Sequence, residues 1–167
     1  MQDARALAEQ DKYQFQWWAL GLVGARPAVS DQKKGADKGI DGRLYFHEGT
    51  TGVTKQVILS VKGGHTNVGD VRDLRGVIDR EKAQIGVLVT LQDSTQPMRT
   101  EAASSGFYEW PWGTHPRLQV LTIADILAGK KIDMPPLGQV NLTFRRAPTA
   151  KAARVGNQPA LQLDDST

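Results

Sequence analysis

Cysteine is absent from this chain of 167 residues, which excludes disulfide bonds, thiolate zinc sites and a cysteine nucleophile. Long apolar runs are missing as well, since no stretch approaches the roughly 20 apolar residues that a membrane-spanning helix needs. The charged first residues, MQDARALAEQDKYQ, lack the apolar centre of a secretory signal peptide. These absences predict a cytoplasmic protein without membrane contact, in which a metal ion would be bound by oxygen ligands, as Mg²⁺ usually is.

Motifs for nucleotide chemistry are also absent. The sequence contains no G-x-x-x-x-G-K-[ST] loop and no G-x-G-x-x-G turn, which argues against nucleotide hydrolases and dinucleotide-dependent enzymes. It has no [D/N]-P-P-[Y/F] motif of amino-methyltransferases, so no methylation activity is predicted. The three histidines, His47, His65 and His115, are scattered along the chain, which is typical of surface or turn residues rather than of a catalytic cluster.

The composition is that of one globular domain. Apolar residues make up 40% and charged residues 23% of the chain, and this length is sufficient for an independent core. The formal net charge of +3 and the pI of about 9.3 indicate a mild basic bias, which is compatible with a polyanionic partner. We expect one domain over residues 1–136 and an extension over residues 137–167, with an edge strand near 140–144 and then a flexible tail.

Apolar periodicity and turn residues predict an alternation of helices and strands. The predicted helices span residues 3–22, 67–83, 95–105 and 123–128, and the predicted strands span 40–47, 55–62, 85–91 and 118–121. The order hairpin, helix, strand, helix, strand, helix predicts an α/β fold with helices on both faces of a mixed sheet. Trp17 and Trp18 of the first helix are interpreted as core residues.

The candidate chemistry lies in residues 35–64. Asp41 stands in a short glycine-flanked turn, and Lys62 ends an apolar strand immediately before two glycines. Because side chains alternate along a strand, Ser60 and Lys62 share one face of it. A carboxylate can bind a divalent ion, and a nearby lysine can orient water or neutralise charge that develops on a phosphate. The same two residues could instead form a structural ion pair, so the spacing leaves both interpretations open.

Several segments together carry a family resemblance: GADKGIDG, QVILSVKGG, VRDLRGVIDREKAQIGVLVTL and TEAASSGFY. In this order and spacing they resemble the Mrr-like branch of the PD-(D/E)XK restriction-endonuclease superfamily, a module found alone or joined to adenine-specific DNA methyltransferases. The resemblance covers about residues 14–136. It implies a three-layer α/β/α fold, a site that uses Mg²⁺ or Mn²⁺, and a DNA substrate. Asp41 matches the metal-binding Asp of the family's G-I-D-G motif, and Lys62 matches the lysine of its [D/E/Q]-x-K motif.

The chain departs from the family pattern at Ser60, where the pattern has Glu, Asp or Gln. A serine hydroxyl is neutral and a weak ligand for Mg²⁺. Three explanations compete. Asp37, Glu48 or the amide of Gln16 completes the metal shell with the carbonyl of Val61; or the metal is bound weakly with a DNA phosphate as a ligand; or the domain no longer cuts and keeps the fold to hold DNA.

The leading hypothesis is a Mg²⁺-dependent DNA endonuclease of a restriction or defence system. The alternative is a catalytically inactive DNA-binding or targeting module of a restriction-modification protein, and a third reading is an interaction domain with an internal Asp41–Lys62 ion pair. Cutting of both strands predicts a homodimer, and the resemblance predicts association with or fusion to a DNA methyltransferase. The candidate catalytic residues are Asp41, Lys62, Ser60 and Gln16, and the candidate metal ligands are Asp41, Asp37 and Val61.

Overall fold

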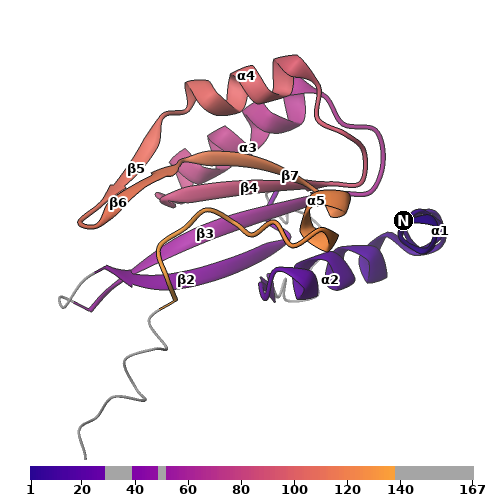
Figure 1. Ribbon diagram of the computed structural model, residues 1–167, viewed down its shortest axis with the longest axis horizontal. Coiled ribbons are helices and arrows are strands. Elements are labelled where there is room, and N and C mark those ends of the chain that lie inside the picture. The colour runs from indigo at the N-terminus through magenta and orange to yellow at the C-terminus, as the bar shows by residue number, and fades with distance from the viewer. Residues whose placement is uncertain (29–38, 49–51, 138–167) are drawn as a thin grey trace, which may run out of the picture.

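The computed structural model describes residues 1–28, 39–48 and 52–137 (Figure 1). The helices in these ranges are α1 (Gln2–Gln10), α2 (Lys12–Leu22), α3 (Val68–Arg80), α4 (Gln96–Ser104) and α5 (Ile123–Leu127). The strands are β1 (Arg26–Pro27), β2 (Gly42–Glu48), β3 (Val53–Lys62), β4 (Ile85–Thr90), β5 (Phe107–Trp110), β6 (Gly113–Pro116) and β7 (Leu118–Thr122). None of the described helices is both long and apolar enough to cross a membrane.

Five strands form a mixed sheet in the order β1-β2-β3-β4-β7. β1 and β2, and β2 and β3, pair antiparallel, whereas β3 with β4 and β4 with β7 pair parallel. The parallel pairs need crossovers, which α3 and α4 supply. β5 and β6 form a separate two-stranded hairpin. The predicted mixed α/β sheet is therefore confirmed.

Alternation along β3 divides the core into two layers. Val57, Leu59 and Val61 are buried on one face with Phe15 of α2, while Ile58 is buried on the other face with apolar side chains of α3 and α4. Figure 1 shows α3 and α4 together on one side of the sheet and α2 and α5 on the other. The fold thus has three layers, α/β/α. Burial of each such side chain contributes about 1.5–3 kcal/mol to stability.

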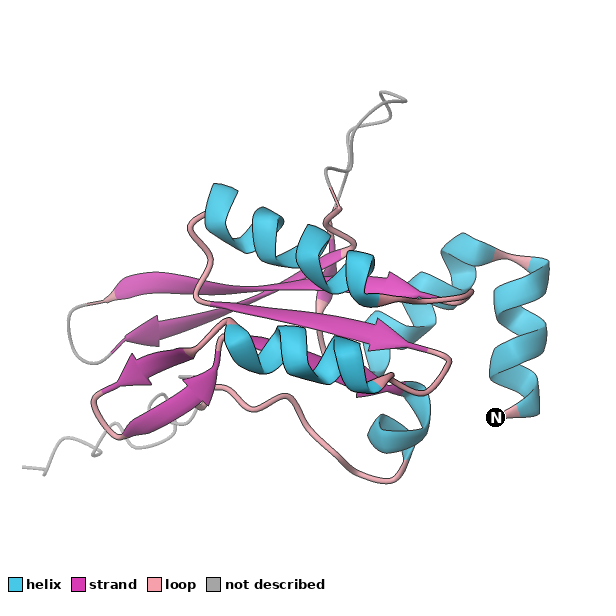
Figure 2. Cartoon of the chain, turned by 90° about the horizontal axis from the view of Figure 1, so that it is seen from above, coloured by secondary structure: helices cyan, strands magenta, loops and turns pink. Residues whose placement is uncertain are grey.

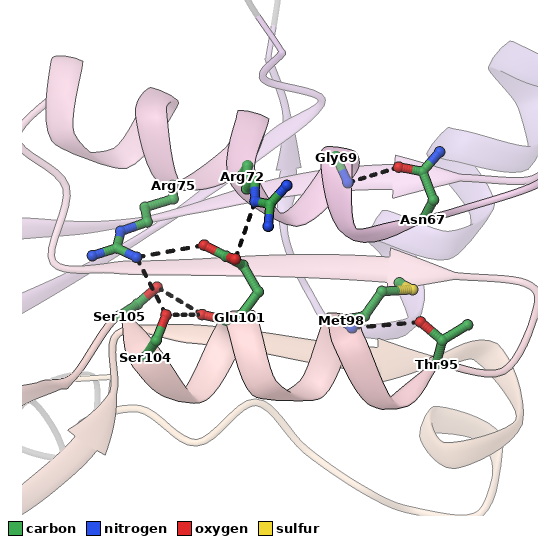
Figure 3. Close-up of polar contacts among 9 residues, drawn as sticks. All are labelled: Asn67, Gly69, Arg72, Arg75, Thr95, Met98, Glu101, Ser104 and Ser105. Atoms are coloured by element: carbon green, nitrogen blue, oxygen red, sulfur yellow. Dashed lines mark hydrogen bonds and ion pairs between the residues drawn. The ribbon is translucent and has the colours of Figure 1, made fainter.

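A polar cluster joins α3 and α4 in the outer layer (Figure 3). The carboxylate of Glu101 on α4 lies 3.1 Å from Nε of Arg72 and 3.6 Å from Nη1 of Arg75. Arg75 also donates a hydrogen bond to Oγ of Ser104 at 3.3 Å. Exposed pairs of this kind contribute roughly 0.2–1 kcal/mol each. They fix how α4 lies against α3 while the apolar faces below supply most of the stability.

The helix predicted over residues 3–22 is in fact two helices. Asp11 adopts an extended conformation, and its carboxylate accepts hydrogen bonds from the backbone N–H groups of Tyr13 at 3.0 Å and Gln14 at 3.1 Å. An Asp in this geometry caps a new helix, so α2 starts at Lys12. Figure 2 shows the resulting bend between α1 and α2.

Other expectations also differ from the structure. Trp17 was expected in the core, but it is 60% exposed, whereas Trp18 is half-buried with its ring 6.0 Å from that of Phe15. Neither the β5–β6 hairpin nor β1 was predicted, because their strands are short and largely exposed. The edge strand predicted near 140–144 lies outside the described residues.

Candidate active site

Asp41 lies where the chain enters β2, and it is held from two sides. Its backbone N–H donates to the carbonyl of Leu59 at 2.9 Å, and its carbonyl accepts from the N–H of Ala28 at 2.9 Å. Its side-chain Oδ2 accepts hydrogen bonds from the N–H of Val61 at 2.7 Å and from Oγ of Ser60 at 3.4 Å. The carboxylate is therefore fixed against the last residues of β3, as the sequence motif predicts.

A glycine next to Asp41 allows this close packing. A Cβ atom at Gly42 would overlap the side chain of Leu20 on α2 and would lie 3.1 Å from the carbonyl oxygen of Arg26 on β1. Only hydrogen fits at this position, so α2 and β1 can both approach the start of β2. The glycines of the G-I-D-G segment thus have a packing role around the acid.

Burial raises the pKa of Asp41 above its ordinary value of 3.8. The hydrogen bond from the N–H of Val61, the charge of Lys62, the hydroxyl of Ser60 and the charge of Lys12 all favour the ionised form, but together they do not offset burial. The charged form of the Asp41 carboxyl group is therefore destabilised by its surroundings. Such groups concentrate at functional sites.

Lys62 ends β3 on the same face as Ser60, and its charge acts on Asp41. The structure therefore brings Asp41, Ser60 and Lys62 together on one face of the sheet, as predicted. The ion-pair partner of Lys62 among the described residues is Asp70 of α3, with Nζ 3.9 Å from Oδ1. The side chain of Lys62 is 43% exposed, so its ammonium can also reach a ligand in solvent.

Two acids of α3 also lie in this region, although the sequence did not predict them there. Asp70 and Asp73 line a small cavity of about 90 Å³ together with Ser60, Lys62 and apolar residues of α3. The second oxygen of Asp70 accepts from the N–H of Asn67 at 2.9 Å and so caps the helix. The signal in the sequence is the Asn67-x-x-Asp70 capping box directly after the turn that follows Lys62, since it places the first helical turn beside the strand end.

The remaining candidate residues lie in different places. Glu48 is at the opposite end of β2 from Asp41, roughly 20 Å away for a strand of this length, and it pairs with Lys55 at 3.2 Å. Gln16 is half-buried on α2, one turn after Lys12, the α2 cation that acts on Asp41. Asp37 lies outside the described residues.

The described side chains around Asp41 offer few ligands for Mg²⁺. Within the described part of the chain no group of three or more His, Asp or Glu residues could hold a metal ion. One oxygen of Asp41 already accepts two hydrogen bonds, and Ser60 offers a neutral hydroxyl where the family pattern has an acid or an amide. Mg²⁺ is usually held by carboxylates together with substrate phosphates and waters. Asp41 is the carboxylate that contacts Ser60 here, whereas Asp70 caps α3 and pairs with Lys62.

The fold is similar to those of two solved restriction endonucleases. The chain matches the DNA modification-dependent restriction endonuclease AspBHI with a TM-score of 0.54 and 22% identity, covering 77% of this chain and 34% of that one. It matches MspJI, solved in complex with a 27-mer oligonucleotide, with a TM-score of 0.51 and 15% identity, covering 76% of this chain and 29% of that one. The chain thus spans about a third of these proteins. No curated protein matches it.

The family itself follows from a sequence model. The model of NA-iREase1, described as NACHT-associated inactive Restriction Endonuclease 1, matches residues 22–122. That range covers more than half of the chain, contains the whole five-stranded sheet with Asp41, Ser60 and Lys62, and leaves out α1 and nearly all of α2. The predicted resemblance to restriction endonucleases is confirmed at this level. The chain is a restriction-endonuclease-like domain and belongs to the NA-iREase1 family.

Proposed function

We propose that this chain is a DNA-binding module that holds the phosphodiester backbone at the Asp41–Lys62 end of the sheet without cleaving it. One observation carries the proposal: the family pattern that the sequence resembles has Glu, Asp or Gln where this chain has Ser60, whose hydroxyl lies 3.4 Å from the carboxylate of Asp41. A site with one buried acid lacks the ligands that would hold Mg²⁺ firmly on its own. The word "inactive" in the description of the family supports the same conclusion.

Cations around the site support DNA as the ligand. Lys62 is 43% exposed at the strand end, and Lys12 on α2 is exposed and acts on the same carboxylate. Phosphate contacts by lysine supply most of the affinity of sequence-independent DNA binding. MspJI, which shares this fold, was solved with an oligonucleotide. The mild positive charge of the whole chain is consistent with such binding.

The test is a salt titration of binding to a fluorescent DNA duplex, with cleavage followed in the same samples in Mg²⁺ and in Mn²⁺. We expect salt-sensitive binding without cleavage, and Lys62→Ala should lower the slope of log affinity against log salt by about one. Lys55→Ala is the matched control, because Lys55 lies on the same strand but pairs with Glu48 at the other end. Binding that is insensitive to Lys62→Ala would refute this site.

A second candidate function is the metal-dependent DNA endonuclease that the sequence predicts. The observation that favours it is the juxtaposition of Asp41 and Lys62 on one face, with a small polar cavity between β3 and α3. In this case a DNA phosphate completes the metal shell. Mg²⁺-dependent nicking by the unmodified protein, lost in both Asp41→Ala and Lys62→Ala, would establish this function and exclude the first.

A carboxylate introduced at position 60 tests whether the serine at this position alone accounts for a loss of cleavage. Glu at position 60 would place a carboxylate beside Asp41, on the face that also carries Lys62. We expect Ser60→Glu to acquire Mg²⁺-dependent nicking of plasmid DNA, and the double variant Ser60→Glu/Lys62→Ala to lack it. If Ser60→Glu folds and binds DNA but cuts nothing, the loss of activity has a cause beyond position 60.

Assembly is a separate part of the proposal. The family is named for an association with NACHT domains, and we infer that this chain acts beside such a domain. The Mrr-like branch, an association with a DNA methyltransferase and a homodimer stay predictions from the sequence. Sedimentation of the protein with and without DNA tests the dimer.

A further inference from the structure

β7 is an edge of the main sheet, and half of its peptide groups point away from its neighbour. The N–H of Gly86 donates to the carbonyl of Arg117 at 2.8 Å, and Gly86 is in register with Leu118, as Leu88 is with Val120. In a parallel pair this register turns the peptide groups of Leu118 and Val120 outward. No hydrogen bond from the described chain reaches them on that side. An edge of this kind can pair with another strand.

The outward edge lies in a groove of about 420 Å³. One wall is α4, with Arg99, Ala102 and Ala103, and the other is the segment after α5, with Lys130 and Lys131. Figure 1 shows α4 above β7. Leu118, Val120 and Phe107 give the groove apolar surface, and Phe107 is 66% exposed. The groove therefore combines unpaired peptide groups with apolar side chains, which are the two features that strand addition uses.

The segment after α5, which forms the second wall, is held by the side-chain amide of Gln119. Oε1 of Gln119 accepts from the N–H of Asp133 at 2.9 Å, and Nε2 of Gln119 donates to the carbonyl of Asp133 at 2.7 Å. This reciprocal pair holds residues 130–133 beside β7 without using the outward peptide groups of the strand. The outward peptide groups of Leu118 and Val120 thus stay unpaired within the described chain.

The charges of the groove favour an acidic occupant. Within the described chain Arg99, Lys130 and Lys131 have no carboxylate within 4.0 Å, and Arg99 bonds instead to the carbonyl of Ser94 and to Gln96. Of the two acids of the lining, Asp125 caps α5 and interacts with the charge of Lys130, and Asp133 lies 2.7 Å from Nδ1 of His115. Arg99 and Lys131 are therefore available to carboxylates of a partner, and Lys130 lies beside them without a close ion pair among the described residues.

We propose that the β7 edge groove binds an extended acidic peptide segment of a partner protein, which adds as a strand to the sheet. Its backbone would pair with Leu118 and Val120, its apolar side chains would contact the groove, and its carboxylates would meet Lys130 and Lys131. This surface is separate from the Asp41–Lys62 end, and the proposal does not depend on DNA binding.

The test uses the ¹⁵N-labelled full chain and the capped peptide acetyl-Glu-Val-Glu-Val-Glu-Val-amide at millimolar concentration. We expect shifts of the Leu118 and Val120 amide resonances and slower hydrogen exchange at both, because each gains a backbone partner. A peptide N-methylated at alternate residues keeps its charge and should bind about tenfold more weakly, since it loses backbone donors.

Two variants test the geometry. Val120→Pro removes an outward N–H that the sheet does not use, so the fold should persist while binding weakens about tenfold. Lys130→Glu/Lys131→Glu should weaken binding at least as much, whereas Arg5→Glu/Lys82→Glu changes the net charge equally and should leave it unchanged. The proposal fails if these amides do not shift, if the N-methylated peptide binds equally, if duplex DNA shifts the same amides, or if they shift with protein concentration alone, as a second copy would cause.

Discussion

Carboxylates lie beside both ends of β3, and the surroundings shift their pKa values in opposite directions. Toward the N-terminal end of β3, where Gln56 contacts Glu81, a hydrogen bond from Arg80 and then the contact with Arg43 lower the pKa of Glu81. At the C-terminal end of β3, burial raises the pKa of Asp41 despite the nearby Lys62. The neighbours of Glu81 stabilise its charged form, whereas burial destabilises the charged form of Asp41. The region around Glu81 is called the matched end below, and the region around Asp41 and Lys62 the site end. A raised carboxyl pKa of this kind is typical of functional sites, and the contrast is consistent with the proposed site at the Asp41 end.

The matched end also ties three elements together. Arg43 of β2 donates to Oε1 of Gln56 on β3 at 2.6 Å, and Gln56 Nε2 donates to the carbonyl of Glu81 at 3.0 Å. The N–H of Gln56 donates to Oε1 of Gln84 at 2.8 Å. These bonds join the hairpin to the end of α3, so this region serves stability. At the site end, burial disfavours the charged form of Asp41, while Lys62 stays 43% exposed.

The largest effect on this contrast is expected from Gly42→Ala at the site end. The added methyl group would overlap Leu20, with the carbonyl of Arg26 at 3.1 Å, and such overpacking costs about 1–3 kcal/mol of unfolding free energy. Gly76→Ala on α3 is the control, since nothing lies within 4 Å of its Cβ position and helix propensity should add roughly 0.5–1 kcal/mol. Urea denaturation measures both variants. An unchanged stability for Gly42→Ala would show that the site end is loosely packed.

A loss of similar size is expected at the matched end from Gln56→Ala. The variant removes the side-chain hydrogen bonds to Arg43 and to the carbonyl of Glu81, and each such bond contributes about 0.5–1.5 kcal/mol. DNA binding should stay unchanged, because the Asp41–Lys62 end is not touched. Urea denaturation and the duplex titration together check this variant. Loss of DNA affinity without loss of stability would reverse the roles of the two ends.

The smallest effect is a pH dependence whose sign differs between the two ends. Since folding raises the pKa of Asp41, the native state binds more protons, and its stability falls as the pH rises from 3.8 through the raised pKa. Asp41→Asn lacks this loss, so we expect it to be the more stable protein at pH 7. For Glu81 the pKa is lowered, so its contribution is lost as the pH falls below 4.5, and Glu81→Gln should be the less stable at pH 7. Thermal unfolding of the unmodified protein and of both variants across pH 3–8 tests this prediction. The difference in melting temperature from the unmodified protein should change with pH in opposite directions for the two variants, and changes of equal sign would refute the contrast.

The sequence predicted the central features of the site because they depend on local patterns. Strand alternation correctly places Ser60 and Lys62 on one face, and the G-I-D-G segment correctly places Asp41 beside them. The contribution of Asp70 and Asp73 could not be predicted in this way, because it depends on how α3 packs across β3.

Other features were missed because their local signals compete. Asp11 is a good helix cap, but the apolar repeat on both sides of it favoured one long helix. The β5–β6 hairpin has strands of only four residues around two exposed positions, so neither alternation nor length indicated it. The groove beside β7 depends on Gln119 and Asp133, which are fourteen residues apart and meet only in the folded chain.

One measurement tests the central claim most directly: binding and cleavage of the same fluorescent, supercoiled plasmid by the purified protein, with Mg²⁺ or Mn²⁺ and with Asp41→Ala and Lys62→Ala in parallel. We predict that the protein binds the DNA, that Lys62→Ala weakens this binding, and that the plasmid stays intact in either metal. Nicking by the unmodified protein that both substitutions abolish would contradict the account and establish a working nuclease.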